Sequence, residues 1–145
     1  MKTDQRPPYK GSCLCGSIEY EVDQIESHMA HCHCSMCRKH TGAALATYGE
    51  ARKENFRWNK GAELLESYVA NNGSTRKFCR VCGSSMTFKA KRGQEDIVVF
   101  ALGSLDSSIE RRPDAHIYVG SKANWFELND ELPKYTEGRG SQGAV

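Results

Sequence analysis

The sequence predicts a mainly β domain with one or two short helices, and three observations support this prediction. Apolar residues alternate with polar ones, the apolar runs are no longer than a strand, and turn-forming residues separate them. The chain has 145 residues, the length of one ordinary domain. We therefore expect several short strands that share one core.

The strands can be placed from their residue patterns. Strict alternation puts Ile18, Tyr20 and Val22 of SIEYEV on one face, as in a half-buried strand. The Asn72-Gly73 pair lies between LLESYVA and TRKFC, and Asn-Gly is the strongest short hairpin signal. The nearly continuous apolar run DIVVFALGSL fits a buried strand, and HIYVG and WFEL are expected to be further short strands.

Helices and domain limits follow from the remaining segments. We expect short helical turns near Ser35–His40 and near Leu105–Arg111. Residues 1–10 are polar and form a predicted lead-in, residues 11–135 form the predicted domain, and the Gly-rich residues 136–145 form a predicted flexible tail.

Composition argues against several classes of partner. The net charge is +2, whereas nucleic-acid-binding domains are usually far more basic, so we expect no nucleic-acid partner. The N-terminus lacks the apolar core of a signal peptide, and no stretch approaches the roughly 18 apolar residues of a membrane span. We therefore predict a cytoplasmic protein without a membrane partner. Thiols stay reduced in that compartment, so clustered cysteines indicate metal binding or catalysis.

Four of the seven cysteines form two close pairs far apart in the chain. Cys13 and Cys15 lie in GSCLCG, and Cys79 and Cys82 lie in FCRVCG. The second pair, followed by Gly83, has the form of a zinc knuckle, in which glycine gives the turn its backbone freedom. Four thiolates from two such turns would form a closed tetrahedral site, which predicts a structural zinc.

The other three cysteines, Cys32, Cys34 and Cys37, lie within HCHCSMCRKH. Three thiolates leave one position of a zinc tetrahedron open, as a catalytic or ligand-binding zinc requires. That position could accept water or the thiol of a small molecule, and zinc would hold such a thiol as the thiolate.

Spacing alone leaves other arrangements open. A nearby histidine could complete the second site as a structural Cys₃His centre, the candidates being His31, His33 and His40. The cysteines could also be grouped differently, for example Cys13 and Cys15 with Cys34 and Cys37. A disulfide or redox-sensing role is a third possibility, although an odd number of cysteines leaves one thiol unpaired.

Four segments carry a resemblance to a known family: GSCLCGSIEYEV, CHCSMCRKHTGA, FCRVCGSSM, and HIYVGSKANWFEL followed by LPKY. In this order they resemble the glutathione-dependent formaldehyde-activating enzyme family, whose domain is shared with centromere protein V, over roughly residues 11–135. The resemblance implies a β-tent-like zinc fold. It also implies that Cys13, Cys15, Cys79 and Cys82 hold a structural zinc and that Cys32, Cys34 and Cys37 form the active-site zinc.

The resemblance further implies carbon–sulfur lyase activity, in which glutathione and formaldehyde form S-hydroxymethylglutathione. Family members commonly carry proline immediately before the tryptophan, whereas this chain has Asn124 before Trp125. That difference concerns the shape of this loop and the choice of substrate, and it leaves the predicted zinc ligands unchanged.

These predictions combine into a mechanism in which a small thiol such as glutathione binds the second zinc through sulfur and attacks a carbonyl such as formaldehyde. Arg38 is a candidate contact for the carboxylates of glutathione, whereas Lys39 is expected to be a solvated surface residue. His33 or His31 could move a proton or orient a ligand sulfur. His116 is expected to be a hydrogen-bonded structural residue, and Trp125 and Phe126 fit a core better than a substrate site.

Two other classes of function compete with an enzyme. A two-zinc domain could present a surface to a protein partner without catalysis, and such a module would not need an open zinc position. A locally basic stretch around Phe78 could bind nucleic acid through six cations: Arg76, Lys77, Arg80, Lys89, Lys91 and Arg92. The sequence carries no signal of oligomeric state.

Overall fold

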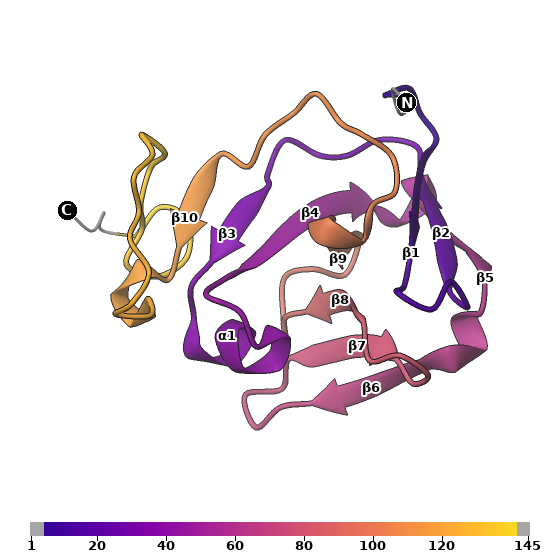
Figure 1. The fold of residues 1–145 in the computed structure, drawn as a ribbon, viewed down its shortest axis with the longest axis horizontal. Coiled ribbons are helices and arrows are strands. Elements are labelled where there is room, and N and C mark those ends of the chain that lie inside the picture. Colours follow the sequence, from indigo (N-terminus) through magenta and orange to yellow (C-terminus); the bar gives the residue numbers. More distant parts are fainter. Residues whose placement is uncertain (1–4, 142–145) are drawn as a thin grey trace. The chain divides into compact units, whose positions relative to one another are not determined.

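The structure, a computed structural model, describes residues 5–141 and is mainly β (Figure 1). Its strands are β1 Tyr9–Ser12, β2 Glu19–Val22, β3 Ala30–Cys32, β4 Ala46–Arg52, β5 Phe56–Lys60, β6 Leu65–Val69, β7 Thr75–Cys79, β8 Ser85–Lys89, β9 Ile97–Ala101 and β10 Ala115–Ile117. Among the described residues the α-helix is α1 Ser35–Thr41, and 3₁₀ turns lie at Lys53–Asn55, Ala62–Leu64, Leu102–Ser104 and Val119–Ser121. The predicted fold class is therefore confirmed.

The chain divides into two compact units, and it passes between them inside β4. The first unit contains the chain up to Ser27 and Gly49–Arg111, and the second contains His28–Tyr48 and the chain from Arg112 onward. The prediction of one domain over residues 11–135 stays a prediction. Strand β1 begins inside the predicted lead-in, and residues 1–4 and 142–145 of the predicted lead-in and tail lie outside the described residues.

One sheet of the first unit has the antiparallel order β1-β2-β5. Ile18, Tyr20 and Val22 are all buried, as their alternation predicts. The ring of Tyr20 stacks on that of Phe56 with centroids 5.0 Å apart. A Cβ atom on Gly11 would lie 2.1 Å from this Tyr20 ring, so β1 requires glycine at that point.

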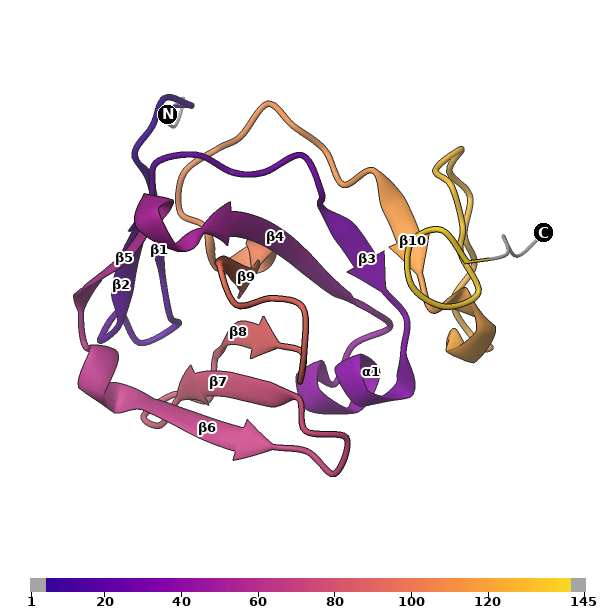
Figure 2. The ribbon, with the colours of Figure 1, turned by 180° about the vertical axis from the view of Figure 1, so that it is seen from behind.

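The other strands of the first unit include an antiparallel meander in the order β6-β7-β8-β9 (Figures 1 and 2). The hairpin predicted at Asn72-Gly73 is present, with Val69 opposite Thr75. Gly73 has a φ of 85°, the left-handed conformation that favours glycine. In β9, the predicted buried strand, Val99 and Phe100 are buried. This hairpin places Cys79 at the end of β7, where a metal-binding turn can follow.

The second unit contains β3 between β10, which is parallel to it, and the start of β4, which is antiparallel to it. The parallel register places His116 opposite His31 and Ile117 opposite Cys32. Residues more than eighty positions apart thus meet beside the second cysteine cluster. The predicted helix near Ser35–His40 is confirmed as α1.

Two predicted elements are wrong. The segment WFEL is not a strand, because the Phe126 N–H donates to the Ala123 carbonyl at 3.2 Å and makes a turn there. The ammonium group of Lys122 donates to the carbonyls of both Ala123 and Phe126 and thereby stabilises this turn. The predicted helix at Leu105–Arg111 is also absent, because the turn there, Leu102–Ser104, ends before it and Leu105 is extended.

No helix among residues 5–141 combines the length and the apolar character needed to cross a membrane.

Candidate metal centres

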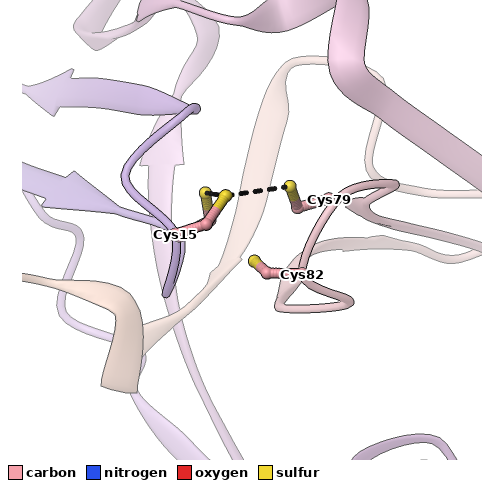
Figure 3. A group of neighbouring side chains, drawn as sticks. Cys15, Cys79 and Cys82 are labelled. Carbon is pink, nitrogen blue, oxygen red and sulfur yellow. Dashed lines mark hydrogen bonds between the residues drawn. The ribbon is translucent and has the colours of Figure 1, made fainter.

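The first cysteine cluster brings together the two predicted pairs of the first unit. The sulfur atoms of Cys13, Cys15, Cys79 and Cys82 all lie within 4.8 Å of one another. The Cys13 and Cys15 sulfurs are 3.6 Å apart. Those of Cys15 and Cys79 are 3.9 Å apart (Figure 3). A tetrahedron with Zn–S bonds of about 2.3 Å has sulfur–sulfur edges of about 3.8 Å. The four cysteines therefore fit a closed zinc site.

Two turns and one serine hold this first cluster. The Ser84 hydroxyl accepts from the Leu14 N–H at 2.9 Å, which ties the turn of the first pair to that of the second. The same hydroxyl is hydrogen-bonded to the Cys82 sulfur at 3.3 Å and lowers the pKa of that thiol to about 5. Burial raises the pKa of the Cys13 thiol. Ionising this buried thiol is costly, and a divalent cation would offset that cost by binding Cys13 as a thiolate.

The second cluster consists of Cys32 at the end of β3, Cys34 immediately before α1 and Cys37 in its first turn. Their three sulfur atoms also lie within 4.8 Å of one another. Among the described residues, no histidine nitrogen or carboxylate joins this group, and no cysteine of the first cluster does. The geometry therefore separates the cysteines into groups of four and three and does not support the alternative groupings.

The start of α1 explains why Cys34 and Cys37 converge. The Cys34 sulfur accepts a hydrogen bond from the Cys37 N–H at 3.2 Å, in the position where serine or aspartate usually caps a helix. Gly42 ends the helix with a φ of 69°, and its N–H donates to the Arg38 carbonyl at 2.8 Å. A short, capped helix thus fixes two of the three sulfurs relative to β3.

The thiols of the second cluster also affect one another's ionisation. Hydrogen bonds with Cys34 and Cys37 raise the pKa of the Cys32 thiol, and its burial adds to the shift. Closely spaced thiols cannot all ionise without a compensating cation, so the donor set fits a soft divalent metal such as zinc. The hydroxyl of Tyr48 lies 3.7 Å from the Cys37 sulfur and is within hydrogen-bonding distance of it.

The nearby histidines form their own hydrogen-bond chain. Nε2 of His33 lies 2.8 Å from Nδ1 of His116, and Nε2 of His116 donates to the Asp130 carboxylate at 2.8 Å. The bond to His116 lowers the pKa of Asp130 to about 2. Nδ1 of His31 lies 2.8 Å from the Thr47 hydroxyl. These contacts agree with the prediction that His116 is a hydrogen-bonded structural residue.

His33 is fully buried, and its Nδ1 has no hydrogen-bond partner among the described residues. Burial lowers the pKa of His33 to about 4, and the nearby charge of His116 adds to this effect. His33 is therefore neutral at pH 7, with Nε2 engaged by His116 and Nδ1 buried. Burial likewise lowers the pKa of His31.

Two cations of the second unit lie near Ser121. The half-buried Arg38 donates from Nε to the Ser121 carbonyl at 3.2 Å, and the Ser121 hydroxyl donates to the His33 carbonyl at 3.2 Å. Lys122 follows Ser121, and its ammonium group donates to the Ala123 carbonyl at 3.0 Å. Lys39 is exposed, as predicted.

Tyr118 has an unusual backbone near the second cluster. It has a φ of 58°, and within the described chain it is the residue other than glycine that adopts the left-handed region. A non-glycine residue in this region costs roughly 1–3 kcal/mol and is often associated with a functional site. Burial raises the pKa of the Tyr118 hydroxyl, and the charges of Cys32 and Cys34 add to this effect.

Two sequence-based interpretations of surface residues need correction. Trp125 is 69% exposed, so the Trp125–Phe126 pair is not a core pair: the turn at Ala123–Phe126 directs the indole outward. Arg76, one of the six cations of the basic stretch, is buried with its guanidinium 4.8 Å from the centre of the Phe88 ring. It is therefore not part of a basic surface.

The sequence did not single out three residues of the second unit: Tyr48 beside the Cys37 sulfur, Asp130 bonded to His116, and Lys122 bonded to the Ala123 and Phe126 carbonyls. Tyr48 and Asp130 lie outside the cysteine motifs, and their contacts with Cys37 and His116 form only in the folded chain. Lys122 lies in the SKANW segment but carries no pattern that predicts its position.

Comparisons with known proteins show what this chain is similar to. Residues 8–121 match the sequence model of a family described as "Glutathione-dependent formaldehyde-activating enzyme". An uncharacterized lyase from Schizosaccharomyces pombe is 24% identical over 131 residues, covering 90% of this chain and 92% of that protein. A Halomonas elongata protein provisionally named a glutathione-dependent formaldehyde-activating enzyme is 29% identical, covering 82% and 80%.

A Rhodobacter sphaeroides protein of known crystal structure is also similar. It is 28% identical, with a TM-score of 0.58, and the match covers 70% of this chain and 91% of that one.

Proposed function

This chain belongs to the glutathione-dependent formaldehyde-activating enzyme family, and we propose that it is a zinc-dependent carbon–sulfur lyase acting on adducts of glutathione or a similar small thiol. The reaction we expect is the joining of glutathione and formaldehyde as S-hydroxymethylglutathione, and its reverse. The lyase name of a relative that covers most of the chain supports this class of reaction.

The observation that carries the proposal is the difference between the two cysteine clusters. The first has four sulfurs at tetrahedral spacing, which fits a closed structural site. The second has three convergent sulfurs and, among residues 5–141, no fourth protein ligand in the group. Three protein ligands leave a zinc one position for a substrate, and a structural site does not need this.

A zinc ion in the second site would supply Lewis-acid stabilisation of a substrate thiolate at neutral pH. Cys32, Cys34 and Cys37 would hold that ion and leave one side open. Arg38 would attract and orient a carboxylate of glutathione, since its Nη groups have no protein partner in the described part of the chain. Because three thiolates on one divalent ion carry a net negative charge, a nearby cation also favours an anionic ligand.

The reaction gives a direct test. Zinc-loaded protein, glutathione and formaldehyde are mixed, and exchange between free and S-hydroxymethyl glutathione is followed by NMR against the uncatalysed rate. We expect acceleration by the wild-type protein and none by the Cys34→Ala, Cys37→Ala variant. Arg38→Ala should raise the KM for glutathione, whereas Lys39→Ala, which removes an exposed neighbouring cation, should not. An uncatalysed rate with the zinc-loaded wild-type protein would refute the proposal.

One observation favours a second function, a zinc-bearing module that binds a protein partner. Leu14 and Val81 lie between the ligands of the first cluster and are 87% and 61% exposed. An apolar residue at the tip of each metal turn fits a contact surface. If both predicted zinc ions bind but the exchange assay shows no catalysis, this function becomes the better explanation.

A further inference from the structure

Strand β6 forms one end of the antiparallel meander, and it is exposed. No segment of residues 5–141 pairs with its outer side, and it is the outermost strand of the meander in both views (Figures 1 and 2). The four residues after Leu65 are all exposed, Tyr68 to 57% and Val69 to 63%. An exposed edge strand can pair with a strand of another chain.

The backbone groups of β6 that face outward follow from its pairing with β7. The Leu64 carbonyl, just before β6, accepts from the Arg80 N–H at 2.9 Å. Antiparallel bonds use every second residue, so the even-numbered residues of β6 bond to β7. Leu65, Ser67 and Val69 therefore direct their N–H and C=O groups outward. Except for the Leu65 N–H, which bonds to the preceding 3₁₀ turn, these groups have no partner in the described part of the chain.

The other sheet edges of residues 5–141 are protected. Residues 105–107 cover β1 and hydrogen-bond to it, and residues 133–135 do the same for β10. Strand β5 carries Arg57 and Lys60, and cations on an edge discourage pairing. The sequence of β6, LESYV, contains no lysine, arginine or proline. Strand β6 therefore lacks the features that keep the other edges from pairing.

The sequence of β6 complements itself in the antiparallel sense. With Ser67 on a two-fold axis, Leu65 lies opposite Val69 of the partner subunit, which makes an apolar pair. Glu66 lies opposite the partner subunit's Tyr68, whose phenol can donate to the carboxylate. The outward N–H groups of Ser67 and Val69 meet outward carbonyls of the other strand, and each bond occurs twice by symmetry. We propose that β6 pairs in this way with β6 of a second copy of this chain.

Other registers are less favourable. A pairing centred on Glu66 would place two carboxylates directly opposite each other, which is destabilising. A pairing centred on Tyr68 would leave Leu65 beyond the end of the partner strand. Pairing through β6 uses the bare edge of each copy, so the assembly closes as a dimer and does not extend into a fibre. Because two five-residue strands form a small interface, we expect a reversible dimer with a micromolar Kd.

Sedimentation equilibrium of the purified protein over a range of concentrations measures the association. We expect wild-type protein to show a monomer–dimer equilibrium. Ser67→Pro removes an outward N–H without removing a bond to β7, and proline is tolerated at such an edge position. Val69→Lys replaces one member of the apolar pair by a cation. Each change occurs twice in a symmetric dimer, so each should raise the Kd about 10-fold or more.

Val81→Lys is the matched control, because Val81 is 61% exposed but lies outside β6, in a turn of the first cluster. It should leave the Kd within about twofold of the wild-type value. Circular dichroism checks that each variant folds, and if Ser67→Pro does not fold, Val69→Lys alone decides. A monomeric wild-type protein, or a dimer that folded Val69→Lys protein forms equally well, would overturn the proposal. Dissociation by Val81→Lys and not by Val69→Lys would also overturn it.

Cross-linking tests the register. Two residues on the axis would have Cα atoms about 5.5 Å apart, inside the range of about 4.4–6.8 Å found in disulfides. Oxidation of Ser67→Cys protein by dissolved oxygen should therefore link two chains at position 67, and mass spectrometry of the linked peptides identifies that bond. Glu66→Cys and Tyr68→Cys are controls on the same strand, because neither residue lies opposite its own copy. A cross-link at position 66 or 68 and none at position 67 would overturn the proposed pairing.

Discussion

The hydroxyl of Tyr48 lies 3.7 Å from the sulfur of Cys37, and both side chains are buried in the second unit. When Cys37 binds a metal as a thiolate, only the tyrosine can donate in this pair. A hydrogen bond of this kind orients the ligand sulfur and stabilises its charge. Tyr48 therefore extends the second site beyond its three cysteines.

Replacing Tyr48 by phenylalanine should weaken zinc binding at the second site about 10-fold. Hydrogen bonds to a metal ligand from residues that do not bind the metal typically contribute 10- to 100-fold to metal affinity. Competition with a chromophoric chelator measures the affinities of the two sites separately. Tyr68→Phe is the control, since Tyr68 is an exposed residue of the first unit. Equal affinity in Tyr48→Phe and wild-type protein would remove the proposed role of this hydroxyl.

The two clusters should bind zinc independently. We expect two zinc ions per chain in protein purified without reducing thiols, as measured by elemental analysis. The Cys34→Ala, Cys37→Ala variant should retain one ion and its fold, because the cluster of four lies entirely in the first unit. One ion per chain in both proteins would mean that the second cluster binds no metal stably by itself.

Loss of the first metal should instead unfold part of the chain. The sulfurs of Cys13 and Cys79 are buried, and four thiols brought together without a cation repel one another once ionised. Chelation or Cys79→Ala, Cys82→Ala should therefore lower the unfolding temperature, which calorimetry would measure. The Cys34→Ala, Cys37→Ala variant serves as the comparison, and its unfolding temperature should fall less.

The sequence predicted the elements that depend on residues close together in the chain. The alternation of Ile18, Tyr20 and Val22 reports one buried face, and the structure buries all three. The Asn72-Gly73 turn and the α1 segment each have a short-range signal that the fold retains. The spacing of the cysteines indicated two clusters because a zinc site imposes its own geometry on any fold that contains it.

The remaining features depend on long-range contacts. The parallel pairing that brings His116 opposite His31 joins residues 85 positions apart, and no local pattern encodes it. The bond between His116 and Asp130 also joins separate segments, 14 positions apart. The segment WFEL has the composition of a strand, but the Lys122 ammonium group stabilises a turn there, and that contact is visible only in the structure.

A glycine in β1 provides a test of the packing around Tyr20. A Cβ on Gly11 would lie 2.1 Å from the Tyr20 ring, so Gly11→Ala should destabilise the protein by roughly 1–3 kcal/mol through overpacking. Gly103→Ala is the control, because a Cβ there meets nothing within 4 Å and should change stability by less than about 0.5 kcal/mol. Urea unfolding of both variants measures the difference, and equal midpoints would show that the ring moves aside without cost.

The hydrogen bond from His116 predicts how stability depends on acidity. It lowers the pKa of Asp130 from the usual 3.8 to about 2, so the folded state binds the proton less tightly than the unfolded state. The stabilisation from this carboxylate is therefore complete above pH 3.8 and is lost as the pH falls toward 2. Asp130→Asn should be less stable than wild type at pH 5, and the two should converge near pH 2. Urea unfolding at several pH values gives the comparison, with Glu131→Gln as the control. A constant difference between Asp130→Asn and wild type across this range would show that Asp130 does not act through its charge.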